Sequence, residues 1–345
     1  TLDFTGVAAD LDLSGVAITG LEKLIIAGGA ANLTLTADQI GSIGEFTGAA
    51  GQVFTITTTV AGLTALGSKA SAGTAGTIAY AVEDTQANIL AGGAVIASMG
   101  ASATLENAQT VAEAQAAIAS SSNVAYNLED TAANLALAPE SVYNNAIAVV
   151  ATDTATAAQA ASITALVTAS NATTAAADDI GAADLTLNIA DTGSSLAQLN
   201  VAETVASDSV TPSDAVTALQ AVDIYANNNA ATFSISDTQA ALTASQADNA
   251  MDNATSITAT TALTVAQVNA FNAASSVDLA DGYAVTDTFA AITGAATAVI
   301  AAAGNVTAND ANITVANAVT LNNLSNSGST SYVLEDAIGT LISAS

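Results

Sequence analysis

The chain has 345 residues and a formal net charge of -29, with 31 acidic residues against two lysines and with no histidine or cysteine. So acidic a chain repels phosphate, which excludes nucleic-acid binding and docking on anionic membranes. Hydrophobic residues make up 51% of the chain but aromatic residues only 3%, so alanine supplies most of the apolar surface. We therefore expect a thin, elongated core, and no membrane insertion, because the most apolar stretch (295–303) is shorter than the roughly 20 residues of a membrane span.

The first sixty residues differ from the rest. Residues 11–26 and 32–40 have the pattern of short strands with glycine corners, and residues 36–40 lead from a strand into a helical turn. We expect residues 1–60 to form a β-rich start of the fold and residues 61–345 to form strand-helix repeats. A continuous chain is favoured over two domains, since residues 36–40 already show the step from strand to helix that recurs later.

A ten-residue pattern recurs without gaps from Tyr80 onward. Its copies begin at Tyr80, Tyr126, Leu187, Phe233, Tyr283 and Tyr332. Each has a large apolar residue first, an aliphatic residue two positions later, aspartate at the fifth position and an apolar residue at the tenth. Four of the six tyrosines of the chain occupy the first position, which chance would not produce.

Each copy predicts a junction from strand to helix. The first and third residues share one face of an extended strand, so that face is expected to be buried. The aspartate is then expected to accept backbone N–H groups as a helix N-cap. The predicted caps are Asp84, Asp130, Asp191, Asp237, Asp287 and Asp336.

A weaker half-repeat lies between these copies. It predicts short helices at residues 60–66, 111–118, 214–219 and 265–271. Asp153 follows Asp130 by 23 positions, half of the 46 that separate Asp84 from Asp130. The full unit of about 46–50 residues is therefore strand-helix-strand-helix, whose strands run parallel. We predict an α/β fold, an elongated solenoid, with a right-handed parallel β-helix or a row of small separate domains as the alternatives.

The repeated pattern resembles repeats of very large secreted bacterial proteins, namely adhesins exported by type I systems, surface-layer-like proteins and extracellular matrix filaments. Residues 18–26 also resemble segments of such calcium-associated proteins. The resemblance implies a secreted or cell-surface location in a bacterium, a structural or adhesive role, and calcium as a common companion. The Gly-Gly-x-Gly-x-Asp calcium repeat of the best-known members does not occur in this sequence.

Candidate calcium ligands are acidic residues grouped in loops, because calcium takes six to eight oxygens. They are Asp178 and Asp179 with Asp184, Asp278 with Asp281, and Asp310 near Asn309 and Asn312. Catalysis would have to rest on carboxylates or on the two lysines. The adjacent acids Glu83-Asp84 and Glu129-Asp130 point to opposite faces of a strand, so they do not converge. We predict that the protein is not an enzyme and has no catalytic cofactor.

The leading functional hypothesis is a structural protein that assembles into a cell-surface layer, sheath or filament. The alternatives are a spacer within a giant adhesin and a glycan-binding module. The expected partners are copies of the chain, the rest of a longer chain, or surface glycans. The last copy of the pattern reaches Leu341, four residues before Ser345, and we expect a partner or further chain to cover it.

Overall fold

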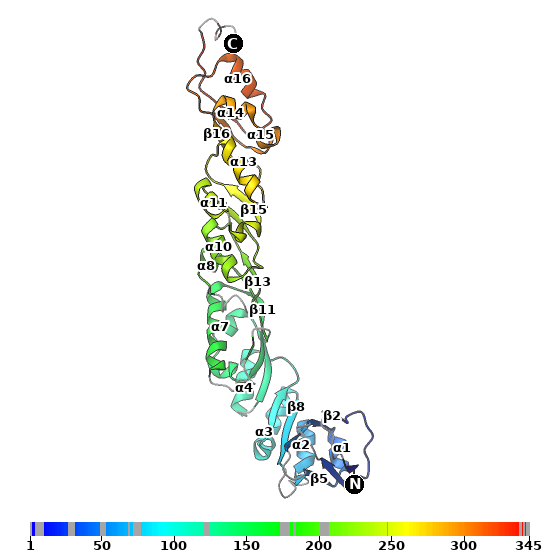
Figure 1. Ribbon diagram of the computed structural model, residues 1–345. Helices are drawn as coiled ribbons and strands as arrows, with labels where there is room; N and C mark the ends of the chain where they lie inside the picture. The colour runs from blue at the N-terminus through cyan, green and yellow to red at the C-terminus, as the bar shows by residue number, and fades with distance from the viewer. Residues whose placement is uncertain are drawn as a thin grey trace. The chain divides into compact units, whose positions relative to one another are not determined.

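A computed structural model describes most of the chain (Figure 1). The described residues are 2–3, 10–26, 32–48, 53–67, 70–71, 77–120, 124–172, 180–181, 184–200, 207–246, 248–337, 340 and 342. The chain forms two compact units. Unit 1 comprises residues 1–153 and 162–186, and unit 2 comprises residues 154–161 and 187–345. This division lies far from residue 60, where the composition changes.

Unit 1 begins with two parallel sheets between which the chain alternates. The first contains β1 (Leu2–Asp3), β3 (Lys23–Ile26), β5 (Glu45–Gly48) and β7 (Ala70–Ser71), in that order. The second begins with β2 (Leu11–Asp12), β4 (Asn32–Thr34), β6 (Val53–Thr58) and β8 (Thr77–Asp84). Helices α1 (Ala37–Ser42) and α2 (Val60–Leu66) connect them. The predicted helical turn at residues 36–40 opens α1, with Thr36 as its N-cap.

The second sheet of unit 1 then continues in chain order. Its further strands are β9 (Ser102–Leu105), β10 (Val124–Asp130) and β11 (Ala146–Ala155), each parallel to the one before. The connecting helices are α3 (Gln86–Met99), α4 (Val111–Ser120), α5 (Ala132–Ala136) and α6 (Glu140–Tyr143), and α7 (Ala157–Asn171) follows β11. The predicted parallel strands with helical connections are confirmed.

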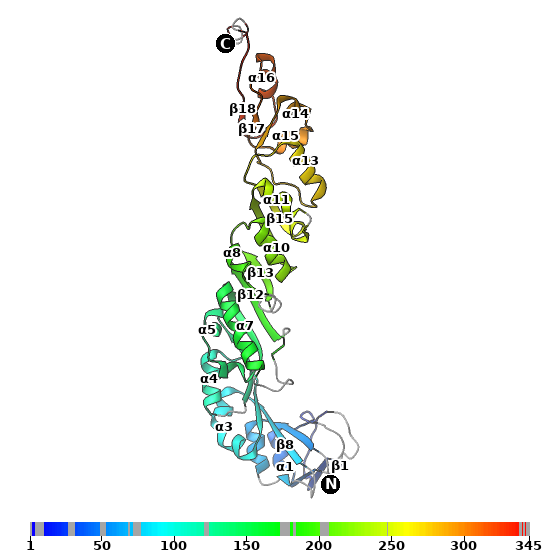
Figure 2. The ribbon, with the colours of Figure 1, turned by 60° about the vertical axis from the view of Figure 1, so that its left-hand side comes forward.

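Strands and helices also alternate along the chain in unit 2 (Figure 2). Its strands are β12 (Leu185–Asp191), β13 (Ser207–Pro212), β14 (Phe233–Asp237), β15 (Ala254–Ala259), β16 (Val285–Asp287), β17 (Val306–Ala308) and β18 (Thr330–Ser331). Its helices are α8 (Gly193–Leu196), α10 (Ala218–Asn227), α11 (Gln239–Ser245), α12 (Asn249–Asp252), α13 (Val265–Ala274), α14 (Phe289–Gly294), α15 (Thr297–Ala302) and α16 (Val315–Asn322). The pairs β12–β13 and β14–β15 and the triplet β16–β17–β18 are parallel.

The strand core follows the ten-residue pattern. Tyr126 and Leu128 are fully buried, and Phe233 with Ile235 are buried in the same way. Buried and more exposed residues alternate along these strands. The expected half-buried strands are therefore confirmed. The apolar residue at the tenth position, such as Leu135, is buried on the helix that follows.

Two buried tyrosine hydroxyls find the same kind of partner. The Tyr126 hydroxyl donates to the Val142 carbonyl at 2.7 Å, and the Tyr283 hydroxyl donates to the Val299 carbonyl at 2.7 Å, in both cases sixteen residues further on. Each bond ties the first residue of a copy to the helix that leads to the next strand, α6 for Val142 and α15 for Val299. A tyrosine can therefore be buried at the first position of the pattern without leaving its hydroxyl unsatisfied.

A β-bulge recurs at the start of three copies. The register shifts by one residue after Tyr126, after Leu187 and after Phe233. The partner strand carries the extra residue, as at Ile147, which is 48% exposed. A bulge redirects the extra side chain and increases the local twist. The exposure of Ile147 therefore follows from the shift in strand register.

One predicted helix begins later than expected. Residues 214–219 were expected to be helical, but α10 begins at Ala218 with Thr217 as its N-cap. Residues 214–217 are a turn that carries Asp214 and an isolated bridge at Val216. The other predicted short helices, at residues 60–66, 111–118 and 265–271, are confirmed by α2, α4 and α13.

Glycines stack where successive rungs of unit 2 turn a corner, a rung being one strand with the helices that follow it. A Cβ on Gly304 would lie 2.6 Å from the Gly282 carbonyl oxygen, and one on Gly328 would lie 2.8 Å from the Gly304 carbonyl oxygen. The Gly328 amide in turn donates to the Gly304 carbonyl at 3.0 Å. The backbones approach so closely here that a side chain does not fit.

Replacing Gly304 by alanine is therefore expected to lower the free energy of unfolding by about 1–3 kcal/mol, because the new methyl group meets rigid backbone. The control is Gly294→Ala, where a Cβ would meet nothing within 4 Å, and a change within about 0.5 kcal/mol is expected. Urea unfolding followed by circular dichroism measures both. Equal stability of the two variants would contradict the close approach.

Candidate functional site

The helices of the ten-residue pattern are capped by the threonine that follows each aspartate. Thr85, Thr131, Thr192, Thr238 and Thr288 have extended backbone conformations, and each side-chain oxygen accepts the N–H three residues later. The predicted cap position is thus corrected by one residue at Asp84, Asp130, Asp191, Asp237 and Asp287. The aspartate still belongs to the strand, so its side chain is left available for another contact. The residues that follow Asp336 are described only in part.

One carboxylate oxygen of each pattern aspartate fixes the cap residue. The Oδ1 atoms of Asp84, Asp130, Asp191, Asp237, Asp287 and Asp336 accept the N–H of the next residue at 2.7–2.8 Å. At Asp84 and Asp130 the same atom also accepts a side-chain N–H, from Asn88 and Asn134. Asp84 is 5% exposed, and these bonds satisfy its buried oxygen.

The other oxygen reaches the helix of the preceding rung. The Oδ2 atom accepts the N–H of the first helical residue, at 3.0–3.1 Å, in the pairs Val60–Asp84, Val111–Asp130, Ala157–Asp191, Ala218–Asp237, Val265–Asp287 and Val315–Asp336. This N–H has no partner within its own helix. Each pattern aspartate therefore completes a helix start 19–34 residues earlier in the chain and orients the start of its own helix.

The alternate rungs use the same bond from a different position. The first helical N–H donates to a carboxylate in the pairs Ala132–Asp153, Gly193–Asp214 and Phe289–Asp310, and to a hydroxyl in Gln239–Thr261 at 3.0 Å. We call all of these cross-rung bonds the aspartate ladder. Asp153 and Asp214 were noted in the half-repeat, but the sequence did not reveal their contact.

The N–H of the cap residue is satisfied in two ways that alternate along the chain. In the pattern rungs it donates to the preceding aspartate. In the alternate rungs it donates to the side chain three residues later, as in the capping boxes of Thr36 with Gln39, Thr217 with Gln220 and Thr264 with Gln267. This Thr-x-x-Gln spacing is the signal in the sequence that identifies threonine as the cap.

The ladder places negative charge where helices are electropositive. The backbone dipoles leave partial positive charge at a helix N-terminus, which favours a carboxylate there. Lysine occurs only at positions 23 and 69, and Lys23 pairs with Glu45 at 3.0 Å across β3 and β5. The helix N-termini therefore stabilise these carboxylates, as basic side chains do in other proteins.

The pKa of Asp130 reflects two opposing effects, burial of the carboxyl group and the hydrogen bonds that it accepts. Burial of the Asp130 carboxyl group acts to raise its pKa, but the hydrogen bonds from the Asn134 side chain and from the N–H groups of Val111 and Thr131 outweigh it. The pKa therefore lies below its ordinary value, as expected when several donors bind the charged form.

The predicted calcium ligands fall into separate places. Asp178 and Asp179 lie outside the described residues. Asp184 accepts the Gly181 N–H at 3.2 Å, and Asp278 and Asp281 are exposed near Tyr283, whose pKa is raised by burial and by these two charges. Asp310 belongs to the ladder, since its Oδ2 atom accepts the Phe289 N–H. Within the described ranges no three acidic side chains gather to form a metal site, and calcium binding stays a prediction.

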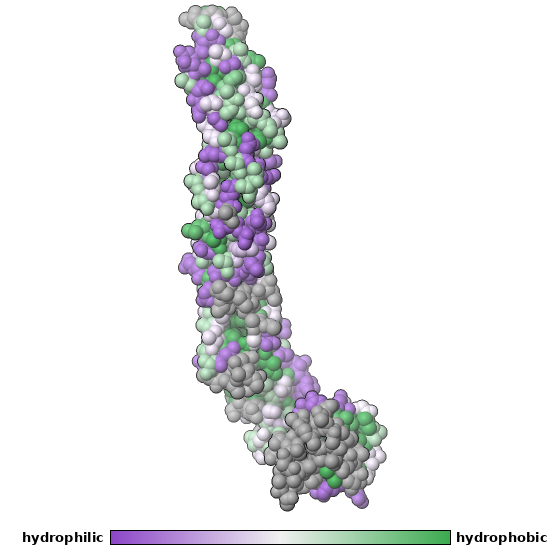
Figure 3. All heavy atoms as spheres, viewed as in Figure 1, coloured by the Kyte–Doolittle hydropathy of each residue, from purple (hydrophilic) through white to green (hydrophobic). Residues whose placement is uncertain are grey.

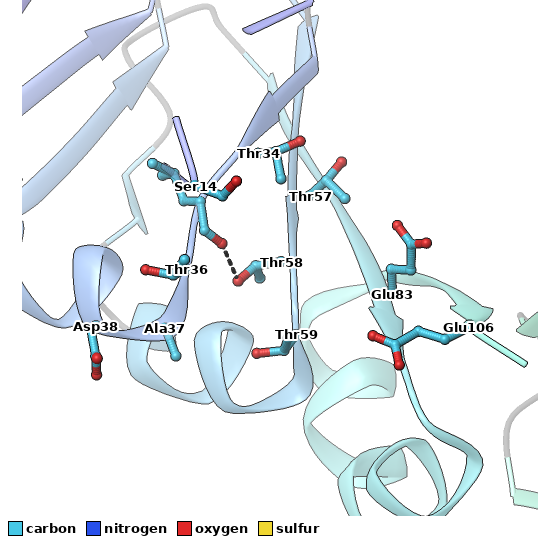
Figure 4. Close-up of a pocket in the computed structure, with 11 residues that line it drawn as sticks. Ser14, Thr34, Thr36, Ala37, Asp38, Thr57, Thr58, Thr59, Glu83 and Glu106 are labelled. Atoms are coloured by element: carbon cyan, nitrogen blue, oxygen red, sulfur yellow. Dashed lines mark hydrogen bonds between the residues drawn. The ribbon is translucent and has the colours of Figure 1, made fainter. Parts of the chain in front are cut away.

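A pocket of about 400 Å³ opens on the second sheet of unit 1 (Figure 4). It is lined mainly by hydroxyl and carboxylate side chains, namely Ser14, Thr34, Thr36, Thr57, Thr58, Thr59, Asp38, Glu83 and Glu106. The Thr58 hydroxyl donates to the Leu35 carbonyl at 2.9 Å. Glu83 and Glu106 come from the ends of successive strands and line one side of the pocket (Figure 4). This lining offers hydrogen bonds to a polar ligand, and the ladder remains the more extensive feature.

No family model, curated protein or solved structure matches this chain. None of the helices that the structure describes has the length and apolarity to cross a membrane.

Replacing Thr261 by aspartate is expected to strengthen the ladder, since Thr261 occupies the place that Asp214 and Asp310 hold in other rungs. A carboxylate at the start of α11 should raise the free energy of unfolding by about 0.3–1 kcal/mol. Thr260→Asp adds the same charge one position away and serves as the control. Urea denaturation in 0.1 M salt measures both, and an equal change in the two variants would contradict the ladder position.

The lowered pKa of Asp130 predicts a defined pH dependence. The pKa of Asp130 in the folded state lies below the unfolded-state value of about 3.9. The ionised Asp130 carboxylate therefore stabilises the fold at pH values above about 3.9. The contribution is lost as the pH falls through the folded-state pKa. The stability difference between the native protein and Asp130→Asn should be constant from pH 7 to 5 and shrink below about pH 4. A difference independent of pH down to acid unfolding would refute this role.

Proposed function

We propose that the protein is a non-enzymatic structural component of a bacterial cell surface, built as an α/β solenoid that assembles into a layer, sheath or filament. The single observation that supports this most is the aspartate ladder, because the recurring acids are engaged in joining one rung to the next. Acids with that role are not available as general acids or bases. In the described ranges the stability of each rung therefore depends on its neighbours, as in repeat proteins.

The edge of the last described strand supports assembly. β18 is the outer strand of its sheet, and Val333 and Leu334 beside it are 62% and 46% exposed. A parallel strand whose outer edge is open within the described residues can accept another strand, from a second molecule or from further chain. Elsewhere on unit 2, hydrophobic and hydrophilic residues are interspersed on the face in view (Figure 3), so the apolar surface is scattered there.

The second candidate function is a spacer within a larger adhesin, and the same ladder favours it. Bonds that connect every rung to the next would carry tension along the chain. A glycan-binding role is supported by the hydroxyl and carboxylate groups of the pocket in unit 1, and a secreted location with calcium present fits the strongly acidic composition.

Electron microscopy of the purified protein in negative stain separates the two leading functions. Assembly predicts ordered polymers that grow with protein concentration, with or without calcium. Val333→Glu is expected to shorten or abolish them by adding charge at the β18 edge, while Ala290→Glu, an exposed position on α14, should not. Monomers at all concentrations in calcium would contradict assembly and favour the spacer.

A further inference from the structure

The joints between successive rungs of unit 2 differ in how much strand they pair. β12 with β13 and β14 with β15 share five register pairs each, and β16 with β17 shares three. Between these groups the pairing is sparse. β13 and β14 are connected by one isolated bridge, Val216 with Ile235, and β15 and β16 by the bridges Ile257 with Leu279 and Leu263 with Val285. We call these the long joints and the short joints.

The short joints of unit 2 carry the aspartates of the ten-residue pattern. Asp237 spans the joint from β13 to β14, and Asp287 spans the joint from β15 to β16. The long joints carry the half-repeat acceptors Asp214, Thr261 and Asp310, one of which is a neutral hydroxyl. Both short joints thus carry a carboxylate, whereas one of the three long joints has a neutral hydroxyl in its place.

Unit 1 follows the rule at one joint and departs from it at another. β9 and β10 share two register pairs, and Asp130 spans that joint. β6 and β8 share six register pairs although Asp84 spans them. The first copy of the pattern lies where the chain leaves its two-sheet region, so the alternation begins after it.

The joint from β15 to β16 shows what the carboxylate adds. Its backbone bonds are Ala280 N–H to Ile257 at 2.7 Å, Leu263 N–H to Ala284 at 2.8 Å and Thr286 N–H to Leu263 at 2.8 Å. To these the Asp287 carboxylate adds the bond from Val265 at 3.0 Å. Its backbone carbonyl accepts the Asn309 N–H at 2.9 Å. The single residue Asp287 therefore contacts both the preceding and the following rung, and so connects three successive rungs.

We propose that Asp237 and Asp287 are latches, and that unit 2 opens first at its short joints. Pairs of rungs joined by long joints then separate as cooperative blocks, namely β12–β13, β14–β15 and β16–β17, while β17 and β18 share only two register pairs. A bond to a charged acceptor contributes more than a bond to a neutral one. At a short joint few backbone pairs stand beside that bond, so its loss there lowers the free energy of opening most. This inference rests on the proposed structural function only for its biological use, since the opening is a property of the single molecule.

Hydrogen exchange of the dispersed full chain, measured in low urea, tests the latch. In Asp287→Ala the amides of Val265, Ala280 and Thr286 should exchange faster as one group, by about tenfold or more, while amides within β14–β15 keep their rates. The matched control is Asp310→Ala, which removes the same kind of bond, from Phe289, inside a long joint. It should affect only the start of α14. Asp287→Asn, which retains one acceptor oxygen, should give a smaller increase and preserves the test if the alanine variant fails to fold.

Two results would overturn the latch. One is that Asp287→Ala speeds exchange equally throughout unit 2, which would mean that the residue supports global stability and no separate joint opens. The other is that Asp310→Ala frees the amides across its long joint to the same extent. Because the measurement uses monomers, absence of polymers in microscopy would reject assembly without affecting this result.

Discussion

The bond on which the described structure depends runs from the first N–H of a helix to a carboxylate in the next rung. A helix start always leaves backbone N–H groups without partners inside the helix. In short helices built mostly of small residues, such as α5 and α8, little side-chain surface is available to offset that cost. A carboxylate about twenty residues further along supplies the missing acceptor and the favourable charge together. The helix and the following strand therefore stabilise each other.

This interaction explains a composition that otherwise looks unfavourable. A net charge of -29 produces strong self-repulsion, and the described part of unit 2 contains no basic side chain to offset it. The backbone itself provides partial positive charge at each helix N-terminus, and this charge stabilises the carboxylates placed there. The remaining acids, such as Asp278 and Asp281, lie exposed where water and salt screen them.

The position of the aspartate, one residue before the helix cap, also determines which hydrogen bonds its carboxylate can accept. Because the threonine after it caps its own helix, the carboxylate is free to use one oxygen locally and the other across the joint. Capping by threonine with a glutamine three residues later achieves the local task in alternate rungs without an aspartate. The pattern aspartates are thus needed mainly for the contact between rungs, which fits their occurrence where strand pairing is sparse in unit 2.

The sequence by itself determined the parts that depend on local order. The spacing of Tyr126 and Leu128 predicted a half-buried strand, and the residues after Asp130 predicted a helix, because both follow from the periodicity of adjacent positions. It also favoured parallel strands, since a helix occupies each return path. Only the tertiary structure showed that the Asp130 carboxylate meets the Val111 N–H, that Thr261 replaces an aspartate, and that Asp310 belongs to the ladder. These contacts join residues about twenty positions apart, and the register that aligns them arises from strand pairing and bulges, which no local pattern encodes.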